Sequence, residues 1–348
     1  MARPAWLDRL RHRPAWLALA GLVALAIVAV AGVMLGTVAL APGDTLAILA
    51  HRLGVPVTVT WPASAETIVV ELRLPRVLMA LAVGAALSLA GVALQGLLRN
   101  PLADPYVLGT ASGAALGAAI ALLLPIEFAL LGFGLIHLLA FAGALGAVAI
   151  VYRVSRLGGL SSLSSVLLTG YAIGSLLAAG LAITMYLSGQ NLRQIFFYLL
   201  GSFSLASWPQ VVVGLPIIVL GSAVLLTRAR SLNALLLGEE TAAHLGLDVR
   251  RERLVLLAAA SLVTAAAVAM AGLIGFVGLV VPHVVRLVAG PNARALLPLS
   301  AIWGAAFLAM ADLIARIPGE LPVGVITGVI GAPFFLFVLR RYRGGYEL

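Results

Sequence analysis

The sequence predicts an all-α polytopic membrane protein with about ten transmembrane helices, since a helix needs about 20 apolar residues to cross a bilayer. Two observations carry this prediction. Of the 348 residues, 62% are hydrophobic and only 10% are charged, whereas soluble domains are about half apolar and about a quarter charged. Apolar runs of about the spanning length also recur along the whole chain. We therefore expect a single transmembrane domain over residues 1–348.

The predicted spans differ in strength. The first contains Ala39-Leu40-Ala41, which resembles a signal-peptidase site. Its apolar run is about twice as long as the core of a signal peptide, so we expect it to remain as a span. The eighth span is short and contains Pro282 and His283. The predicted segments cover residues 15–40, 75–98, 106–124, 130–152, 163–187, 209–228, 252–272, 274–290, 296–315 and 322–339.

The distribution of arginine predicts the orientation. The chain has no lysine, and alternate loops on one side of the predicted spans contain 17 of the 22 arginines. Positively charged loops stay in the cytoplasm. We therefore expect both termini to be cytoplasmic. The remaining arginines are expected at the outer face: Arg52, Arg73, Arg76, Arg193 and Arg316.

Three of the outer arginines come from two separate parts of the chain. Arg73 and Arg76 flank Pro75 at the start of the second predicted span, where proline fits because its missing N–H would be unpaired in a first helical turn. Arg316 reaches the same face from the ninth span. Each could anchor a helix end in the lipid headgroups. Together they could instead form a docking surface for an acidic partner.

Ionisable side chains within a membrane usually have a function, and few are present in the predicted spans. Asp312 and Arg316 are spaced i,i+4, which predicts a local ion pair near the outer surface. His137 is expected to be a hydrogen-bonded packing residue. A competing class, the ion-coupled secondary transporter, would need buried carboxylates or broken-helix ion sites. Asp312 alone is thin support for that class.

Several enzyme chemistries are excluded. The chain has no cysteine, which removes disulfides and thiolate sites. Without lysine it cannot contain the GxxxxGK[ST] phosphate-binding loop. The histidines lie in different segments, no HExxH sequence is present, and the serines of 161–165 have no neighbouring base. We therefore expect no catalytic residue and no metal site.

Two loops are longer than a turn requires. Residues 189–201 have apolar side chains at helical spacing, which predicts a short interfacial helix over about 190–201. Residues 228–253 contain a segment with Glu239 and Glu240 in its first turn and Gly246 after its last, the pattern of a capped helix. That helix is too polar for the membrane, so we expect it to contact a partner protein.

Small residues predict close helix contacts within the membrane, since they let backbones approach. Some glycine pairs have the small-xxx-small spacing, and about half of such pairs are expected to mark real interfaces in a chain with 37 glycines. They include Gly113/Gly117, Gly170/Gly174 and Gly324/Gly328.

Five ordered blocks make the chain resemble the permease family of ABC importers for cobalamin, haem and ferric siderophores. They run through most of the sequence: RLPR at 73–76, GLLRNPLADPYVLG at 96–109, LNALLLGEETAAHLGLD at 232–248, GLIGFVGLVVPHVVRL at 272–287 and ADLIARIPGELPVGVITGVIGAPFF at 311–335.

This resemblance implies the type II ABC importer permease fold, in which ten spans per subunit form a homodimer in the bacterial inner membrane. The fifth spans line a path on the dimer axis. Two ATP-binding subunits, which hold ATP and Mg, bind the cytoplasmic face, and a periplasmic substrate-binding protein delivers the ligand. This chain would bind no cofactor of its own. The cargo is expected to be haem or a ferric siderophore, the commoner substrates of the family, with cobalamin as the alternative.

The resemblance also implies site residues. Arg73, Arg76 and Arg316 match arginines that pair with glutamates of the binding protein. Leu163 weakens the match of the second gate segment, because the cobalamin importer has a hydroxyl there. The ATPase-coupling helices, about 229–251, contain Gly238, Glu239, Glu240, Thr241, Ala242, His244, Leu245 and Gly246. The cytoplasmic gate matches Asn100, Leu102, Ser162, Leu163 and Ser164. Candidates for the path are Tyr171, Thr184, Met185 and Tyr186, for which lipid-facing or packed positions stay open.

Overall fold

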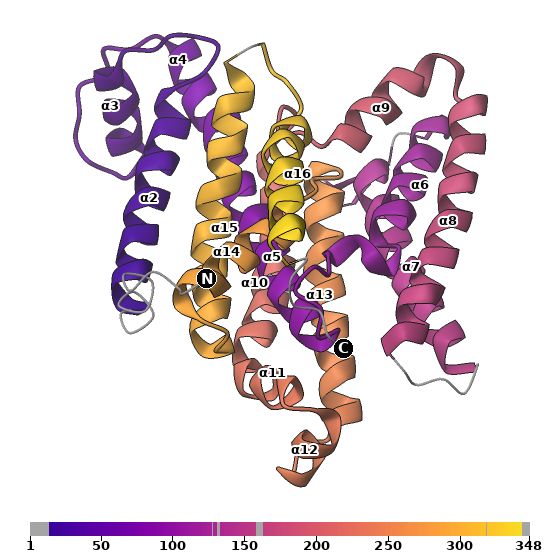
Figure 1. The fold of residues 1–348 in the computed structure, drawn as a ribbon. Helices are drawn as coiled ribbons and strands as arrows, with labels where there is room; N and C mark the ends of the chain where they lie inside the picture. Colours follow the sequence, from indigo (N-terminus) through magenta and orange to yellow (C-terminus); the bar gives the residue numbers. More distant parts are fainter. Residues whose placement is uncertain (1–13, 127, 131–132, 158–162, 318, 343–348) are drawn as a thin grey trace.

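Apolar helices form the body of the protein (Figure 1). The computed structural model describes residues 14–126, 128–130, 133–157, 163–317 and 319–342. Seven helices in these ranges are long and apolar enough to cross a membrane, and three apolar helices are shorter. The ten are α2 (Pro14–Met34), α5 (Leu74–Leu97), α6 (Thr110–Leu123), α7 (Leu135–Leu157), α8 (Leu163–Leu187), α10 (Trp208–Thr227), α13 (Val249–Ala271), α14 (Val277–Ala289), α15 (Ala293–Arg316) and α16 (Val323–Tyr342).

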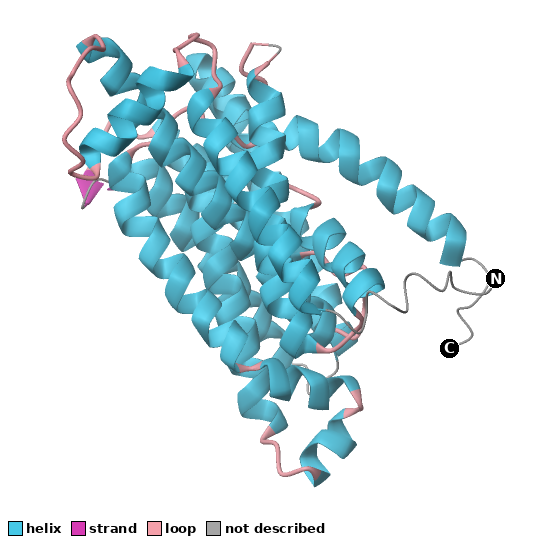
Figure 2. Ribbon diagram, turned by 90° about the vertical axis from the view of Figure 1, so that its left-hand side faces the viewer, coloured by secondary structure: helices cyan, strands magenta, loops and turns pink. Residues whose placement is uncertain are grey.

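The remaining elements are short and lie mostly at the two ends of the bundle (Figures 1 and 2). Helices α3 (Pro42–Arg52), α4 (Ala63–Thr67) and α9 (Leu192–Leu200) are at the end that contains Arg76, here called the Arg76 end. Helices α11 (Ala229–Leu236) and α12 (Glu239–His244) project at the opposite end, here called the α12 end. The others are η1 (Ile68–Arg73), η2 (Pro105–Leu108), η3 (Gly189–Asn191) and an antiparallel hairpin of β1 (Ala129–Leu130) and β2 (Phe133–Gly134), with Ala129 opposite Gly134.

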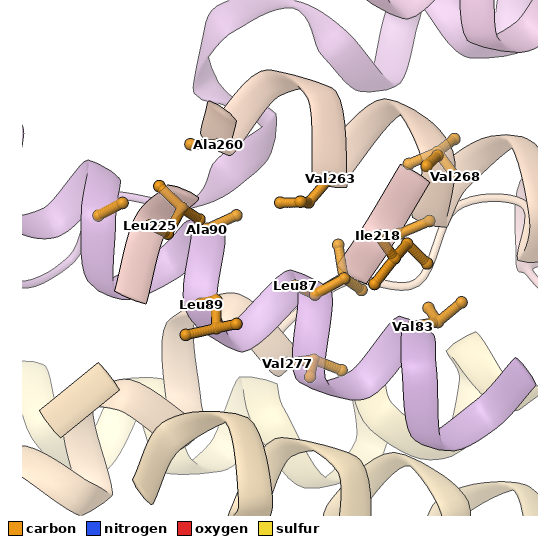
Figure 3. Close-up of a cluster of buried hydrophobic side chains, with 14 of the residues drawn as sticks. Val83, Leu87, Leu89, Ala90, Ile218, Leu225, Ala260, Val263, Val268 and Val277 are labelled. Carbon is orange, nitrogen blue, oxygen red and sulfur yellow. The ribbon is translucent and has the colours of Figure 1, made fainter. Parts of the chain in front are cut away.

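Helix α5 is the central helix of the bundle. Its side chains are buried along most of its length, and it packs against α10, α13, α14 and α15. Figure 3 shows Leu87 and Ala90 of α5 among Ile218 and Leu225 of α10 and Val263 of α13. An apolar helix that is buried all round belongs in the core of a large bundle. The other elements are therefore arranged around α5.

Glycines allow the closest contacts of α5. A Cβ atom built on Gly91 would lie 1.9 Å from the carbonyl oxygen of Gly278 in α14. One built on Gly84 would lie 2.3 Å from the carbonyl oxygen of Gly304 in α15. No side chain fits at such distances, so the two crossings depend on bare backbone. This is the packing mode expected for membrane helices.

The predicted small-xxx-small pairs were partly correct. A Cβ on Gly113 or Gly117 would clash with the backbone of α7, and one on Gly170 with the carbonyl oxygen of Val107. Gly324 meets the carbonyl oxygen of Leu200 in the same way. Gly174 has only ordinary contacts, and Gly328 has open space around it.

Three predicted boundaries were wrong in an informative way. The first span ends at Met34 and not at residue 40, because arginine side chains bind the last carbonyls of α2 there. Pro75 is not in a first turn, since α4 and η1 continue into α5 without a break from Ala63. η1 is a π-helical segment that ends just before this proline, and such segments often accompany irregularities within a helix. The fourth span begins at Leu135, after the hairpin.

We predict that Gly91→Ala destabilises the protein by about 3 kcal/mol, the upper part of the range for overpacking, because the new methyl group would overlap the backbone of α14. The measurement is the thermal melting temperature in detergent. Gly146→Ala is the matched control, since no atom lies within 4 Å of a Cβ at Gly146. Equal melting temperatures for the two variants would contradict the packing described for α5.

Candidate functional site

Asp312 is the centre of a charged network at the Arg76 end. Its side chain is 1% exposed. Its carboxylate accepts hydrogen bonds from Nε and Nη2 of Arg76, at 3.1 and 2.9 Å, and from Nη2 of Arg316 at 2.6 Å. The ion pair predicted between Asp312 and Arg316 is confirmed. Arg76, which is far away in the sequence, joins α5 to the same carboxylate of α15.

Arg316 and a third arginine, Arg73, bind the C-terminal end of α2. Arg316 Nη1 donates to the carbonyl of Gly32 at 2.7 Å, and Arg73 Nη1 donates to the carbonyl of Met34 at 2.7 Å. Arg73 further donates to the carbonyls of Val33 and Val38. The last carbonyls of a helix lack partners within it and carry partial negative charge. The guanidinium groups therefore stabilise the end of α2 and hold α2, α5 and α15 together.

Glu320 extends the network towards the surface. Its carboxylate binds Arg76 Nη1 at 2.7 Å and accepts a hydrogen bond from the hydroxyl of Ser204 at 3.1 Å. Glu320 lies in the turn between α15 and α16, and Ser204 lies in the loop between α9 and α10. The side chain of Glu320 is 34% exposed, so Glu320 is the accessible acid of the network.

The structure brings together the three arginines predicted for docking, but it does not leave them open. Arg73, Arg76 and Arg316 are 5%, 9% and 6% exposed, and each binds acceptors within the chain. The charge of these arginines and their position at one common end could be predicted from the sequence, whereas the burial of their side chains could not. Their role in docking stays a prediction. Glu320 and the carbonyls of α2 were missed because no spacing rule links them to the arginines.

A cavity of about 660 Å³ lies next to this network, beneath α9. Its wall is mostly apolar and its polar lining includes Arg193, Gln194, Gln210, Ser202 and Glu320. His137 also lines the cavity and is hydrogen-bonded to Gln210 at 2.9 Å, in agreement with its predicted packing role. Cavities of this size and composition are typical of small-molecule sites.

The helix predicted in the second long loop is confirmed as α12 at the opposite end of the bundle. Its Glu239 pairs with Arg253 of α13, and its Ala242 is buried. Gly238 and Gly246 flank the helix with φ angles of 117° and 82°, which side chains rarely adopt. Glu240 is exposed. The segment is therefore an ordered surface helix, held from one side. The list of predicted coupling residues also includes Thr241, His244 and Leu245, all exposed.

The short helix predicted over about 190–201 is confirmed as η3 and α9. Ile195 is buried, whereas Phe196 is 53% exposed. The helix therefore packs on the bundle with one face.

The loop after α5 contains the first predicted gate residues. Asn100 is exposed, and its side-chain oxygen accepts a hydrogen bond from the backbone N–H of Leu102. Burial raises the pKa of Asp104 to about 6, although its carboxylate accepts the N–H of Tyr106. The Tyr106 hydroxyl binds the carbonyl of Ile274 at 3.0 Å, which fixes the loop to the segment between α13 and α14. Ser162 and the side chains of Leu163 and Ser164 lie outside the described residues.

The candidate path residues on α8 have different surroundings. Tyr171 and Tyr186 are 78% and 89% exposed, and Met185 is half-buried. Thr184 is buried, and its hydroxyl donates to the carbonyl of Gly180 one turn earlier in the same helix. Of the four, the two tyrosines have side chains available to another molecule.

This architecture defines a multi-pass membrane protein with an ordered surface helix at one end and, at the other, a mostly apolar cavity with a few polar lining residues. Comparison with known proteins narrows the class. The model of the FecCD transport family matches residues 23–341. A solved structure described as an inward-facing conformation of a metal-chelate type ABC transporter is 32% identical, has a TM-score of 0.79 and covers 93% of this chain and 98% of that chain.

Curated relatives agree with this match. The cobalamin import system permease protein of Halobacterium salinarum is 44% identical, and the alignment covers 94% of this chain and 96% of that protein. The hemin transport system permease protein of Yersinia pestis is 42% identical, with 78% and 83% covered. The Fe(3+) dicitrate permease protein FecD of Escherichia coli is 40% identical, with 81% and 89% covered.

The chain is therefore a permease of an ABC importer. It belongs to the FecCD transport family, and its fold is that of a metal-chelate ABC transporter permease. The three relatives are named as permeases for cobalamin, hemin and Fe(3+) dicitrate.

We predict that Asp312→Ala destabilises the protein by about 3–5 kcal/mol, the usual cost of breaking a buried ion pair, because two buried guanidinium groups lose their shared carboxylate. The melting temperature in detergent measures this. Glu66→Ala is the control: its pair with Arg52, whose side chains are 27% and 56% exposed, has the same chemistry at the same end and should contribute about 0–1 kcal/mol. A similar small effect at Asp312 would show that the network does not hold the helices together.

Proposed function

We propose that this chain is the channel-forming subunit of an ATP-driven importer that receives a metal chelate from a periplasmic binding protein. Two copies would form the path, and two separate ATP-binding subunits would drive it. The observation that supports this most is α12: a short, polar, glycine-flanked helix held at one end of an apolar bundle. Such a helix adds little to the packing of the bundle, but it offers a rigid surface to an ATP-binding subunit.

The bundle would lie in a bacterial inner membrane with the α12 end in the cytoplasm. The arginine count supports this orientation, because 17 of the 22 arginines fall on that side of the predicted spans. α2 begins at the α12 end and α16 runs towards it. Both termini would then be cytoplasmic.

The homodimer is supported by the exposure of α8. Only 6% of its apolar membrane-spanning stretch is buried within the chain, against 78% for the stretch that contains α5. Tyr171 and Tyr186 project from this helix. A second copy facing α8 would place these tyrosines along a shared path.

Among cargoes, cobalamin becomes the first candidate. The relative named for cobalamin import aligns over 94% of this chain, whereas the relative named for hemin transport aligns over 78%. Haem or a ferric siderophore, the cargo expected from the sequence, is the second candidate because hemin and ferric dicitrate permeases are nearly as similar.

An ion-coupled carrier would need a carboxylate that is free to bind and release an ion. Asp312 instead accepts hydrogen bonds from Arg76 and Arg316 on both of its oxygens. The network therefore favours the ATP-driven class.

The burial of Arg73, Arg76 and Arg316 changes how docking must be tested. Reversing the charge of Arg76 or Arg316 would place a carboxylate beside Asp312, and reversing that of Arg73 would place one beside the last carbonyls of α2. A loss of docking would then follow from misfolding alone. The accessible position of this network is Glu320.

We predict that Glu240→Arg abolishes stimulation of the ATPase subunits, at least about tenfold, while the melting temperature stays unchanged, because the side chain is exposed and like-charge or misplaced groups at an interface cost several kcal/mol. ATP hydrolysis by the purified complex in lipid nanodiscs is the measurement.

The control for this variant is Glu66→Arg, which introduces the same charge at the Arg76 end. If stimulated hydrolysis is normal in Glu240→Arg, α12 is not the coupling surface. If no stable complex with an ATPase subunit can be purified at all, the proposed function itself is wrong.

A further inference from the structure

Glu320 has an unusual backbone conformation. Its φ angle is 62°, one of three positive values among the non-glycine residues that the structure describes, and the preceding Gly319 has a φ of 99°. Side chains other than glycine, asparagine and aspartate rarely adopt this region. Strain of this kind persists only where the surroundings hold it, and it marks sites of function.

The side chain of Glu320 connects three parts of the protein. It pairs with Arg76 of α5 and accepts a hydrogen bond from the hydroxyl of Ser204, while its own backbone belongs to the turn before α16. Ser204 is held further by its neighbour, because its N–H donates to the hydroxyl of Ser202 at 3.1 Å. The loop of residues 201–207 is thus tied to the arginine network through one carboxylate.

That loop borders the cavity beneath α9. Ser202, Ser204, Leu205 and Glu320 all line it, together with Ala271 from the buried end of α13. Glu320 and Leu205 are 34% and 88% exposed, so the pair of Glu320 and Ser204 stands where the cavity wall reaches the surface, here called the mouth. Release of this carboxylate would free the loop and widen the entrance.

The two carboxylates on Arg76 are not equally replaceable. Asp312 is 1% exposed and binds Nε and Nη2, whereas Glu320 is 34% exposed and binds Nη1. A buried guanidinium group that loses a charged partner is strongly destabilised. Glu320 can therefore leave without cost only if another carboxylate takes Nη1, whereas a neutral group would leave the charge under-compensated.

We propose that Glu320 is an internal stand-in for a carboxylate of an acidic protein partner, and that exchange of the two on Arg76 opens the cavity beneath α9. The inference rests on the docking part of the proposed function for the identity of the partner. The latch itself, formed by Arg76, Glu320 and Ser204, stands on the contacts within this chain.

The test uses the absence of cysteine from the sequence. Ala271→Cys places one thiol in the cavity wall, at a position that is 3% exposed. Its rate of reaction with a membrane-impermeant maleimide, in the purified permease without any partner, reports the opening of the mouth. Adding Glu320→Gln should raise this rate about tenfold, the effect of losing one hydrogen bond to a charged group.

Two controls separate opening from misfolding. Glu66→Gln removes a carboxylate from another arginine at the same end and should leave the rate at Ala271→Cys unchanged. A thiol at Leu53, which is 85% exposed, should react equally fast with and without Glu320→Gln. An unchanged rate at Ala271→Cys in the Glu320→Gln variant would overturn the latch.

The exchange of carboxylates on Arg76 is tested by titrating the importer's purified binding protein onto two forms of the permease in nanodiscs, one with Glu320 and one with Glu320→Gln. Removing the internal competitor should tighten binding several-fold, and binding should speed labelling of Ala271→Cys in the form that keeps Glu320. Equal affinity for both forms would overturn the stand-in role. If the binding protein binds neither form, the proposed docking fails, and the labelling rates measured without a partner still decide the latch.

Discussion

The structure depends on one buried carboxylate shared by two guanidinium groups. Removing charges from water is costly, by several kcal/mol per ion, and only good geometry with further hydrogen bonds offsets that cost. Asp312 meets this condition with contacts of 2.9 and 2.6 Å to Arg76 and Arg316. The remaining donors of Arg316, and those of Arg73, bind the last carbonyls of α2. Three helices that are distant in sequence are thus joined at one end.

Backbone contact holds α5 against α14 and α15 along its length. In a bilayer, apolar side chains gain little by leaving lipid, so helices associate through close packing and hydrogen bonds. Gly84 and Gly91 bring α5 against Gly304 and Gly278. The arginine network fixes the register at one end, and the glycines remove the space in which α5 could shift. We therefore expect motion during transport to occur in the peripheral elements, such as α8, α9 and the loop of residues 201–207.

Patterns local in sequence predicted much of the fold. The ten apolar segments, the surface helices α9 and α12, and the pair of Asp312 and Arg316 each follow from hydropathy, capping residues or i,i+4 spacing. What could not be predicted depends on tertiary contact. Residues 35–40 are apolar enough to continue the first span, yet the helix ends at Met34 because arginines from elsewhere take its carbonyls. Arg76 and Glu320 carry no sign in sequence that they pair with each other.

The burial of the three arginines also depends on tertiary contact and could not be predicted from the sequence. Charge and topology place Arg73, Arg76 and Arg316 at one face, and both an anchor and a docking surface fit that placement. Only the acceptors around them show that internal pairing dominates in this state. A docking partner must therefore compete with groups already present.

The central claim is that this permease moves a metal chelate by means of ATP. The most direct measurement is uptake into proteoliposomes that contain the chain with its ATPase subunits and binding protein, with cobalamin, haem and a ferric hydroxamate offered in parallel. We expect uptake of one ligand that requires both ATP and the binding protein and that survives collapse of all ion gradients. Uptake that follows an ion gradient and does not need the ATPase would contradict the account.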